Sequence, residues 1–473
     1  MKALRYVVFL ILLLALILLV AVPYGMGWWI KGQYKVWVDQ ANQQNPAIQL
    51  SVSDYQRGWF HSTATLKADI KDPVLRQQLS HSKSPIKLPL DVDLVVDHGL
   101  VVMTKSPTGN RHWAIARAVI NGQVERDNID IDALSSLNLN NQISTEVMIH
   151  QLSLPLEGGN YSMKDALIHS NVSVNGEKGR SNIVIPTVVF ELSSGEAMSL
   201  SLDQVSITNN FNKNGELVFG KRSVAVDKVT VKSGKHLIQS HDWLLSSEVL
   251  PQGDTTNLLL HAAIKSYKSE KEKSGPLSLD FSLKQMNTQA LSDFMKDVAD
   301  NDVQSLQVNQ MVFPLLSVLK HGVEGSLALS YQSSNGPISV QGHLSMPDSK
   351  DKSIFAIIPL LKADCNITVP DLWMQQTLAW LVNRTNVANG QPVVGGSVSI
   401  TQAKQAIQRL VEEKMLVQKA DQLTMNATIK SGEILVNGLT PDFTALTQAT
   451  SGSEEESPSP AKKTETSSVD ASS

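Results

Sequence analysis

The strongest constraint on this chain is an apolar run close to its start. Fourteen of the sixteen residues from Val7 to Val22 are large and apolar, and only Ala15 and Ala21 interrupt them. Each such side chain favours insertion into a bilayer by about 0.3–0.6 kcal/mol, so the run contributes roughly 4–8 kcal/mol. The sequence therefore predicts a membrane-embedded helix at the start of a chain that is otherwise rich in strand patterns.

The run can be a permanent anchor or a cleaved signal peptide. The uncharged stretch extends from Tyr6 to Ile30, which is roughly 37 Å of helix and longer than the ~7–15 apolar residues of a signal peptide. The best small-x-small cleavage site, Gly25–Gly27, is followed at once by Trp28 and Trp29, a pair that suits the headgroup region. We therefore expect an uncleaved anchor.

Charges beside the run set its expected orientation. Lys2 and Arg5 precede it, Lys31 and Lys35 follow it, and positive residues favour the cytoplasmic side of a membrane. The denser first flank predicts a cytoplasmic N-terminus, and no second long apolar run returns the chain. The single cysteine, Cys365, excludes a lipoprotein and an intrachain disulfide, which suits a bacterial periplasm or a cytosol.

These observations divide the chain into four parts: a cytoplasmic stub at 1–5, a transmembrane helix at 6–30, a β-rich extracytoplasmic region at 31–449 and a tail at 450–473. The tail combines prolines with many Ser and Glu residues, so its composition predicts disorder. A net charge of −4 and a pI near 6.3 give no basic surface for nucleic acid.

Strands dominate the expected fold. Apolar and polar residues alternate in 48–52, in 60–70 and in 86–96, with a turn expected at Tyr55–Gly58 and Pro89 expected to place its strand at an edge or a bulge. Further strand-like segments recur every 12–20 residues or so between 143 and 283, which predicts a β-meander.

Helices are expected mainly in the last third of the chain. Apolar stripes at helical spacing run through 290–298 and 303–319, and further helices are predicted at 370–381 and 401–419. Strands are expected between and after them, including 354–369, 423–430 and 433–436. The fold class is thus α+β, mostly antiparallel β, with one N-terminal transmembrane helix and a few late helices.

Known catalytic and ligand-binding motifs are missing from the sequence or incomplete. Gly215–Lys221 has the spacing of a phosphate-binding loop, but Arg222 replaces the hydroxyl residue that coordinates Mg²⁺. Asp130 and Asp132 lack the glycine and distal glutamate of a calcium loop. No paired histidines or cysteines offer a metal site, so we expect no cofactor, no metal, no nucleotide and no enzymatic activity.

One group of residues carries a family resemblance. Its members are Tyr55, Arg57, Gly58, Trp59, Phe60 and Ser62 at a hairpin, and His98 and Gly99 at the end of a later strand. Together with the leading apolar run, this pattern resembles the YdgA-like family of bacterial inner-membrane proteins, which has no assigned activity. Leu100 departs from the proline expected after His-Gly. The resemblance implies an inner-membrane location with the bulk of the chain in the periplasm.

The motif residues are expected to support the fold rather than to bind a ligand. Gly58 can take a positive φ at the turn, Arg57 can pair at its rim, and Trp59 with Phe60 can cover the end of the sheet. The leading hypothesis is a membrane-anchored binding or structural module whose partner is lipid, another protein or a second copy of the chain. An envelope hydrolase with a dispersed site is the alternative.

Overall fold

The computed structural model describes residues 47–441 with gaps, the longest at 77–87, 301–317 and 389–395, and a few helical residues between 31 and 42. The expected anchor at 6–30, most of the apolar stripe at 303–319 and the tail at 450–473 lie outside the described residues. Among the helices that the structure does describe, none is long and apolar enough to cross a membrane.

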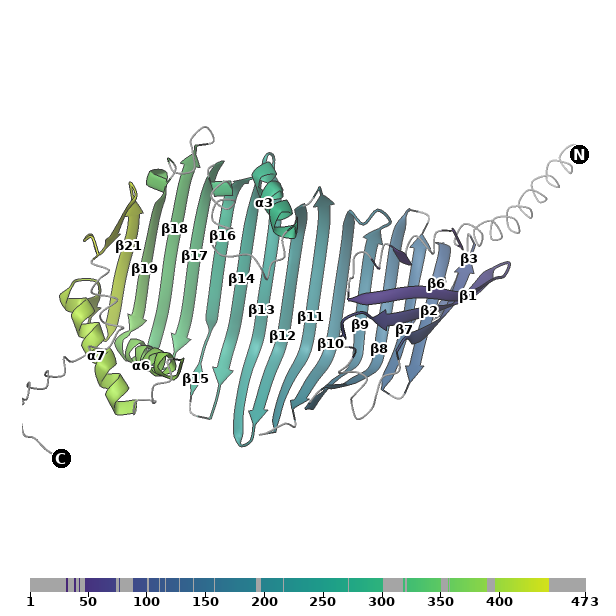
Figure 1. The fold of residues 1–473 in the computed structure, drawn as a ribbon, viewed down its shortest axis with the longest axis horizontal. Helices are drawn as coiled ribbons and strands as arrows, with labels where there is room; N and C mark the ends of the chain where they lie inside the picture. The colour runs from purple at the N-terminus through teal and green to yellow at the C-terminus, as the bar shows by residue number, and fades with distance from the viewer. Residues whose placement is uncertain are drawn as a thin grey trace, which may run out of the picture.

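The fold is a single antiparallel meander of long strands (Figure 1). Its first half comprises β1 (Ile48–Arg57), β2 (His61–Ile70), β3 (Leu90–His98), β6 (Ala116–Arg126), β7 (Ile129–Asn138), β8 (Gln142–Leu156), β9 (Gly159–Ser173), β10 (Lys178–Leu192) and β11 (Met198–Asn214). Each of these strands pairs with the one before it in this order. The sheet therefore grows in one direction along the chain.

The second half continues in the same direction. It comprises β12 (Leu217–Ser233), β13 (His236–Gln252), β14 (Thr255–Lys268), β15 (Lys273–Ser274), β16 (Leu277–Asn287), β17 (His321–Ser333), β18 (Gly336–Asp348), β19 (Lys362–Pro370), β20 (Val417–Lys419), β21 (Gln422–Lys430) and β22 (Glu433–Val436). β15 adds to β14, while β20 and β22 both pair with β21 at the far edge. Together these strands form one sheet of 20 strands.

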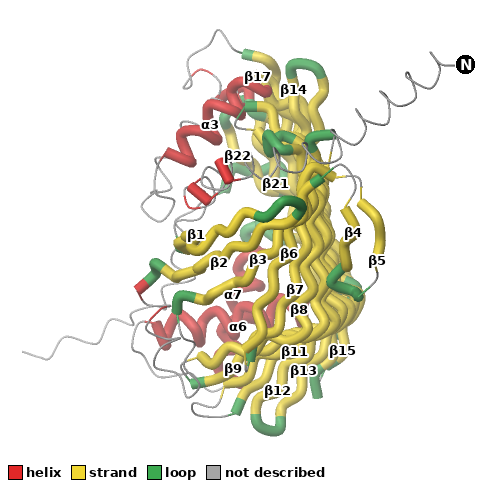
Figure 2. Tube along the Cα trace, turned by 90° about the vertical axis from the view of Figure 1, so that its right-hand side faces the viewer, coloured by secondary structure: helices red, strands yellow, loops and turns green. Residues whose placement is uncertain are grey.

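The two faces of the sheet carry different elements (Figure 2). The helices α3 (Thr288–Asp300), α6 (Asp371–Ala388) and α7 (Gly396–Glu412) lie on one side, and the hairpin of β4 (Val102–Lys105) and β5 (Arg111–Ala114) lies on the other. A short 3₁₀ turn, η1 (Ile358–Leu360), precedes β19. The sheet curls at its N-terminal end, so β1 and β2 cross β7–β9 on the helix-bearing side (Figures 1 and 2).

Side-chain burial concentrates at the two ends of the sheet. At the C-terminal end, α6 and α7 pack on a core built around Leu423, which is fully buried, with Ile338, Val369 and Ile407. At the N-terminal end, Ala64 and Leu94 form the centre of another cluster, and further buried residues follow on β3 and β6. A third cluster joins α3 to β14, β16 and β17. Between β10 and β13 the described elements provide no second layer.

Most strand predictions are confirmed by the pairing. Ser62 and Ala64 alternate with exposed residues on β2, and the strand predicted at 433–436 has those bounds. The prediction that Pro89 places its strand at an edge or a bulge is wrong. β3 begins one residue after Pro89 and lies between β2 and β6, so the N–H that proline lacks falls outside the hydrogen-bonded ladder. The strand expected at 354–369 is also too long, since β19 begins only at Lys362.

Candidate functional site

The motif hairpin joins the first two strands of the sheet. β1 continues through Arg57, which pairs with Ser62. Tyr55 and Arg57 therefore lie in the strand, whereas the sequence predicted them in the turn. Asp54 takes a left-handed φ of 56° beside a break in register between Ser53 and Gln56. This bulge bends β1 just before the motif.

Gly58 is required by close packing rather than by a left-handed backbone. Its φ is not among the positive values, contrary to the conformation expected for this turn. A Cβ at this position would instead overlap the carbonyl oxygen of His61. Because a backbone oxygen cannot swing aside as a flexible side chain does, the turn excludes every larger residue.

The aromatic pair after Gly58 does not fill the end of the sheet. Trp59 is 49% exposed and Phe60 is 50% exposed, so the expectation that these rings cover the sheet end is wrong. Half of each ring surface faces solvent at the turn. An exposed aromatic pair of this kind contributes less to stability than a buried one.

Ser62 and His98 form the buried part of the motif. Ser62 Oγ lies 3.2 Å from Nε2 of His98, and the backbone N–H of His98 donates to the carbonyl oxygen of Phe60. A histidine at this distance can act as a base toward a serine nucleophile. However, the two residues are only 1% and 2% exposed, so a substrate has no route to the hydroxyl. The contact joins β2 to β3, where Gly99 ends the strand.

Asp97, the neighbour of His98, provides a pH-dependent contribution to stability. Burial raises the pKa of its carboxyl above the ordinary value of 3.8, while the positive charge of His61 acts in the opposite direction. Asn121 Nδ2 donates to Asp97 Oδ2 at 3.4 Å. A raised pKa means that the folded chain binds this proton more tightly than the unfolded chain, so ionisation of Asp97 destabilises the fold.

We therefore expect Asp97→Asn to raise the melting temperature at pH 7. Below pH 3.8 the carboxyl is protonated in both states, so the advantage of the variant should disappear there. Thermal unfolding of the solubilised full chain at both pH values measures this difference. A variant that is less stable than wild type at pH 7 would contradict the assignment.

A second candidate site is one face of the sheet. The strand register forms one row of apolar residues across β10–β14, which consists of Ile185, Val205, Val226, Trp243 and Ile264. We call the surface that carries these residues the apolar face. It is also the face on which α6 and α7 pack, because Leu329, Ile367 and Met425 continue the same rows.

The opposite surface, the polar face, has a different composition. The neighbouring row holds Ser206, Ala225, Leu244 and Ala263. A hydroxyl pair from β11 and β12 lies on the same face, with Thr208 Oγ1 2.6 Å from Ser223 Oγ. Leu244 and Val184, the β10 residue that pairs with Ser206, are thus apolar residues among small and hydroxyl residues.

A change in side-chain phase keeps the apolar face continuous along each strand. Met163 and Ala166 belong to one packed cluster on β9, and Trp243 Nε1 donates to Ser240 Oγ at 2.7 Å on β13. Residues three apart on a regular strand point to opposite faces. Both pairs therefore show that the alternation shifts by one residue within the strand.

Left-handed residues mark where this shift occurs. Asp165, Gln204 and Asp242 have φ values of 53°, 54° and 53° in the alternate strands β9, β11 and β13. The register places Asp165 and Gln204 on either side of Pro186 in β10, and Asp242 opposite Asp227 in β12. The irregular positions therefore form a line across the sheet.

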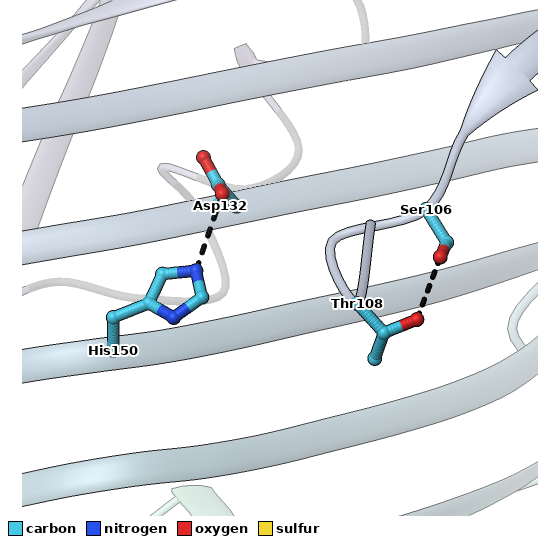
Figure 3. A network of polar contacts seen from close by, with 4 residues as sticks. All are labelled: Ser106, Thr108, Asp132 and His150. Carbon is cyan, nitrogen blue, oxygen red and sulfur yellow. Dashed lines mark hydrogen bonds and ion pairs between the residues drawn. The ribbon is translucent and has the colours of Figure 1, made fainter. Parts of the chain in front are cut away.

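Charged contacts lie along and beside this line. Asp242 accepts a hydrogen bond from Lys265 Nζ at 2.8 Å, which raises the pKa of the lysine. Asp132 lies 3.2 Å from His150 on the neighbouring strand (Figure 3), and the same view shows Ser106 and Thr108 hydrogen-bonded after β4. In the part of the chain that the structure describes, no three metal-binding side chains converge.

As far as the described elements extend, the apolar face is uncovered over β10–β13 and over the middle of β14, whereas α3 packs on β14 at Leu258 (Figure 1). Exposed large side chains on it include Leu192, Met198, Val224, Trp243, Leu245 and Leu260. At ~4.8 Å per strand and ~3.3 Å per residue, five strands with eight-residue apolar stretches cover about 24 by 26 Å. Apolar patches of several hundred Å² on a monomer often have a function.

The phosphate-loop spacing has no counterpart in the fold. Gly215 takes a φ of 62° in the turn between β11 and β12, and Lys221 lies within β12. A phosphate-binding loop needs a helix to follow it. The segment is instead a hairpin strand, in agreement with the incomplete motif.

Comparison with known proteins places the whole described sheet in one family. A family model described as "Bacterial protein of unknown function (DUF945)" matches residues 1–441. The chain belongs to this family. No curated protein and no solved structure matches it. The narrower resemblance to YdgA-like proteins stays a prediction.

For this DUF945 member, the sequence found only one of the two candidate sites. The motif residues do come together, since the Ser62–His98 contact joins the hairpin to the later strand. The apolar face was recognised only as a one-sided sheet, without its uncovered region. The sequence pattern that indicates this face consists of two alternating apolar runs within one strand. The two runs are out of phase and meet at a polar pair, such as Lys164–Asp165 or His241–Asp242.

Proposed function

We propose that this DUF945 protein is a membrane-anchored binding protein of the bacterial envelope, whose apolar face holds the acyl chains of a lipid. The observation that carries the proposal is the uncovered apolar surface of β10–β13 and the middle of β14, with Leu245 56% exposed at its centre. The apolar run Val7–Val22 supports a location at the membrane.

The dimensions of the uncovered region suit an acyl chain. An eight-residue apolar stretch is about 26 Å long at ~3.3 Å per residue. One leaflet of the hydrocarbon core is about 15 Å thick, half of ~30 Å. A chain can therefore lie along a strand with its whole length against apolar side chains, while the backbone of the sheet keeps its own hydrogen bonds.

The hydrolase alternative has no observation in its favour. Ser62 and His98 have a suitable separation but are both buried, and the exposed residues of the motif, Arg57, Trp59 and Phe60, carry no carboxylate, imidazole or nucleophile. We therefore propose no catalytic role for the motif.

Two neighbouring leucines allow a matched test of lipid binding. Leu245 lies on the apolar face and Leu244, which is 37% exposed, lies on the polar face. We expect Leu245→Glu to reduce the phospholipid that co-purifies with the full chain by at least about tenfold, because an unpaired carboxylate against an acyl chain costs more than ~1.4 kcal/mol. Leu244→Glu should retain it. Extraction and mass spectrometry of the bound lipid give the measurement.

The same samples separate lipid binding from self-association. Light scattering of each purified variant reports its oligomeric state. If Leu245→Glu converts a dimer into a monomer without changing the bound lipid, the apolar face is a contact between copies. Equal lipid content in all three proteins would also overturn the proposal.

A further inference from the structure

Helix α6 exposes an apolar surface that the sheet does not use. Leu372, Trp380 and Leu381 are 52%, 56% and 44% exposed, although α6 also packs on the sheet through Trp373, Met374 and Leu378. A helix at the surface of a globular protein normally has polar residues on its outer side. The helix α6 is therefore apolar on both its inner and its outer side.

The exposed residues form one stripe along the helix. Leu372, Gln376, Trp380 and Arg384 are each four residues apart and are all exposed, and the guanidinium of Arg384 lies 5.2 Å from the ring centre of Trp380. A tryptophan with an adjacent arginine is suited to the membrane–water interface, where the ring lies at headgroup level and the long basic side chain reaches phosphate. We call these four residues with Leu381 the α6 stripe.

The helix pair that contains the stripe is basic. From Asp371 to Glu412 three basic residues (Arg384, Lys404 and Arg409) stand against two acidic ones (Asp371 and Glu412) at the outer ends of the helices, which gives +1 in a chain whose net charge is −4. Lys404 and Arg409 are exposed on α7, which packs beside α6. Positive charge close to an anionic lipid surface adds favourable binding energy for each residue. This charge favours an anionic partner over a neutral or basic one, and the exposed Trp380 beside Arg384 favours lipid headgroups.

The stripe lies far from the start of the sheet. There are 13 strand-to-strand steps from β6 to β21, which is about 60 Å at ~4.8 Å per step. Figure 1 shows α6 and α7 at the end of the sheet opposite to β1–β3. A contact made here is therefore far from β1–β3, and it involves a helix that packs on strands beyond β14.

From the exposed Trp–Leu stripe and the basic charge around it, we infer that α6 and α7 bind the surface of an anionic phospholipid membrane. Trp380, Leu372 and Leu381 enter the interface, and Arg384 with Lys404 contacts the phosphates. This inference does not depend on acyl-chain binding by the apolar face.

Capture of vesicles tests the inference on the full chain. The protein is inserted in phosphatidylcholine nanodiscs, which occupy any N-terminal anchor. Vesicles in which about 30% of the lipid is anionic phosphatidylglycerol are then added. Wild type should capture these vesicles and not pure phosphatidylcholine vesicles. Trp380→Ser and Arg384→Glu should each weaken capture about tenfold, and salt should weaken it further.

Matched variants control for general changes in polarity and charge. Met103→Ser removes an equally exposed apolar side chain from β4, and Lys232→Glu reverses an exposed charge on β12. Both should capture vesicles as wild type does. Equal melting temperatures for all variants would show that the fold is intact.

Three results would overturn the inference: capture that ignores lipid charge, capture that survives both α6 substitutions, or equal losses in the control variants. If the α6 substitutions instead abolished a crosslink to another protein and left vesicle capture unchanged, the stripe would be a protein contact. The phospholipid that co-purifies with Trp380→Ser should stay at the wild-type level, so a failure here is distinguishable from a failure of acyl-chain binding.

Discussion

Leu423→Ala should lower the free energy of unfolding by about 4 kcal/mol. Leu423 on β21 is fully buried and lies in the cluster that α6 and α7 cover, together with Ile338 and Val369. Truncation removes the apolar contacts and leaves a cavity that neither the sheet nor the two helices can close completely. Urea unfolding of the solubilised full chain, followed by intrinsic fluorescence, measures the loss.

A leucine nearby in the sequence provides the control. Leu439 is 45% exposed just after β22, so Leu439→Ala should cost less than about 1 kcal/mol. Hydrogen exchange should locate the damage of Leu423→Ala in α6, α7 and β21. Similar losses in both variants would show that this cluster does not hold the C-terminal end together.

Gly58→Ala should destabilise the N-terminal end of the sheet by about 1–3 kcal/mol. Even the smallest added side chain places a Cβ against the carbonyl oxygen of His61, so the turn or β2 must move. Gly32→Ala is the control, because a Cβ there meets nothing within 4 Å. The variant should accumulate less in cells and be cleaved faster by protease, whereas the control should match wild type.

The same variant separates support of the fold from recognition. A cellular phenotype of Gly58→Ala should follow its abundance if the motif is structural. Normal abundance and protease resistance combined with loss of the phenotype would contradict that interpretation. The half-exposed rings of Trp59 and Phe60 would then be the first residues to examine as a recognition surface.

The order of the strands could be predicted because each strand has one apolar side and each turn is short. A chain of consecutive alternating segments with polar turns has few ways to pair other than with its neighbours. The alternation in 60–70 predicted β2 and the burial of Ser62 and Ala64 for this reason. No residue in this inference depends on a distant contact.

The phase shift could not be predicted by the same rule, because strict alternation assumes an unbroken period of two. Across Asp165 and Asp242 the apolar residues are three apart, as in Met163 and Ala166. A regular period of two therefore assigns half of each strand to the wrong face. Aspartate takes the left-handed conformation more readily than most residues. An aspartate between two apolar runs is therefore the local indication of the shift, and a rule of strict alternation does not use it.

The exposure of the motif aromatics depended on tertiary structure. A Trp-Phe pair beside a glycine turn is consistent with a buried plug, and nothing local indicates whether another element covers it. Likewise, the outer side of α6 reads as a buried helix in the sequence, because Trp380 and Leu381 are apolar. Only the position of α6 at the end of the sheet leaves them exposed.

The one-directional sheet has a consequence for how the protein folds and fails. Because each long strand hydrogen-bonds only to the strands next to it in the order of the chain, the stability of the chain resembles a linear array in which each hairpin adds its own term. Such an array has a low contact order, so its strands can pair one after another in the order of the chain. The sheet should also unfold from its ends inward. The helices α6 and α7 at the C-terminal end, and the side-chain amide of Asn42 that hydrogen-bonds to Leu50 of β1, should therefore protect the two ends from edge-to-edge aggregation.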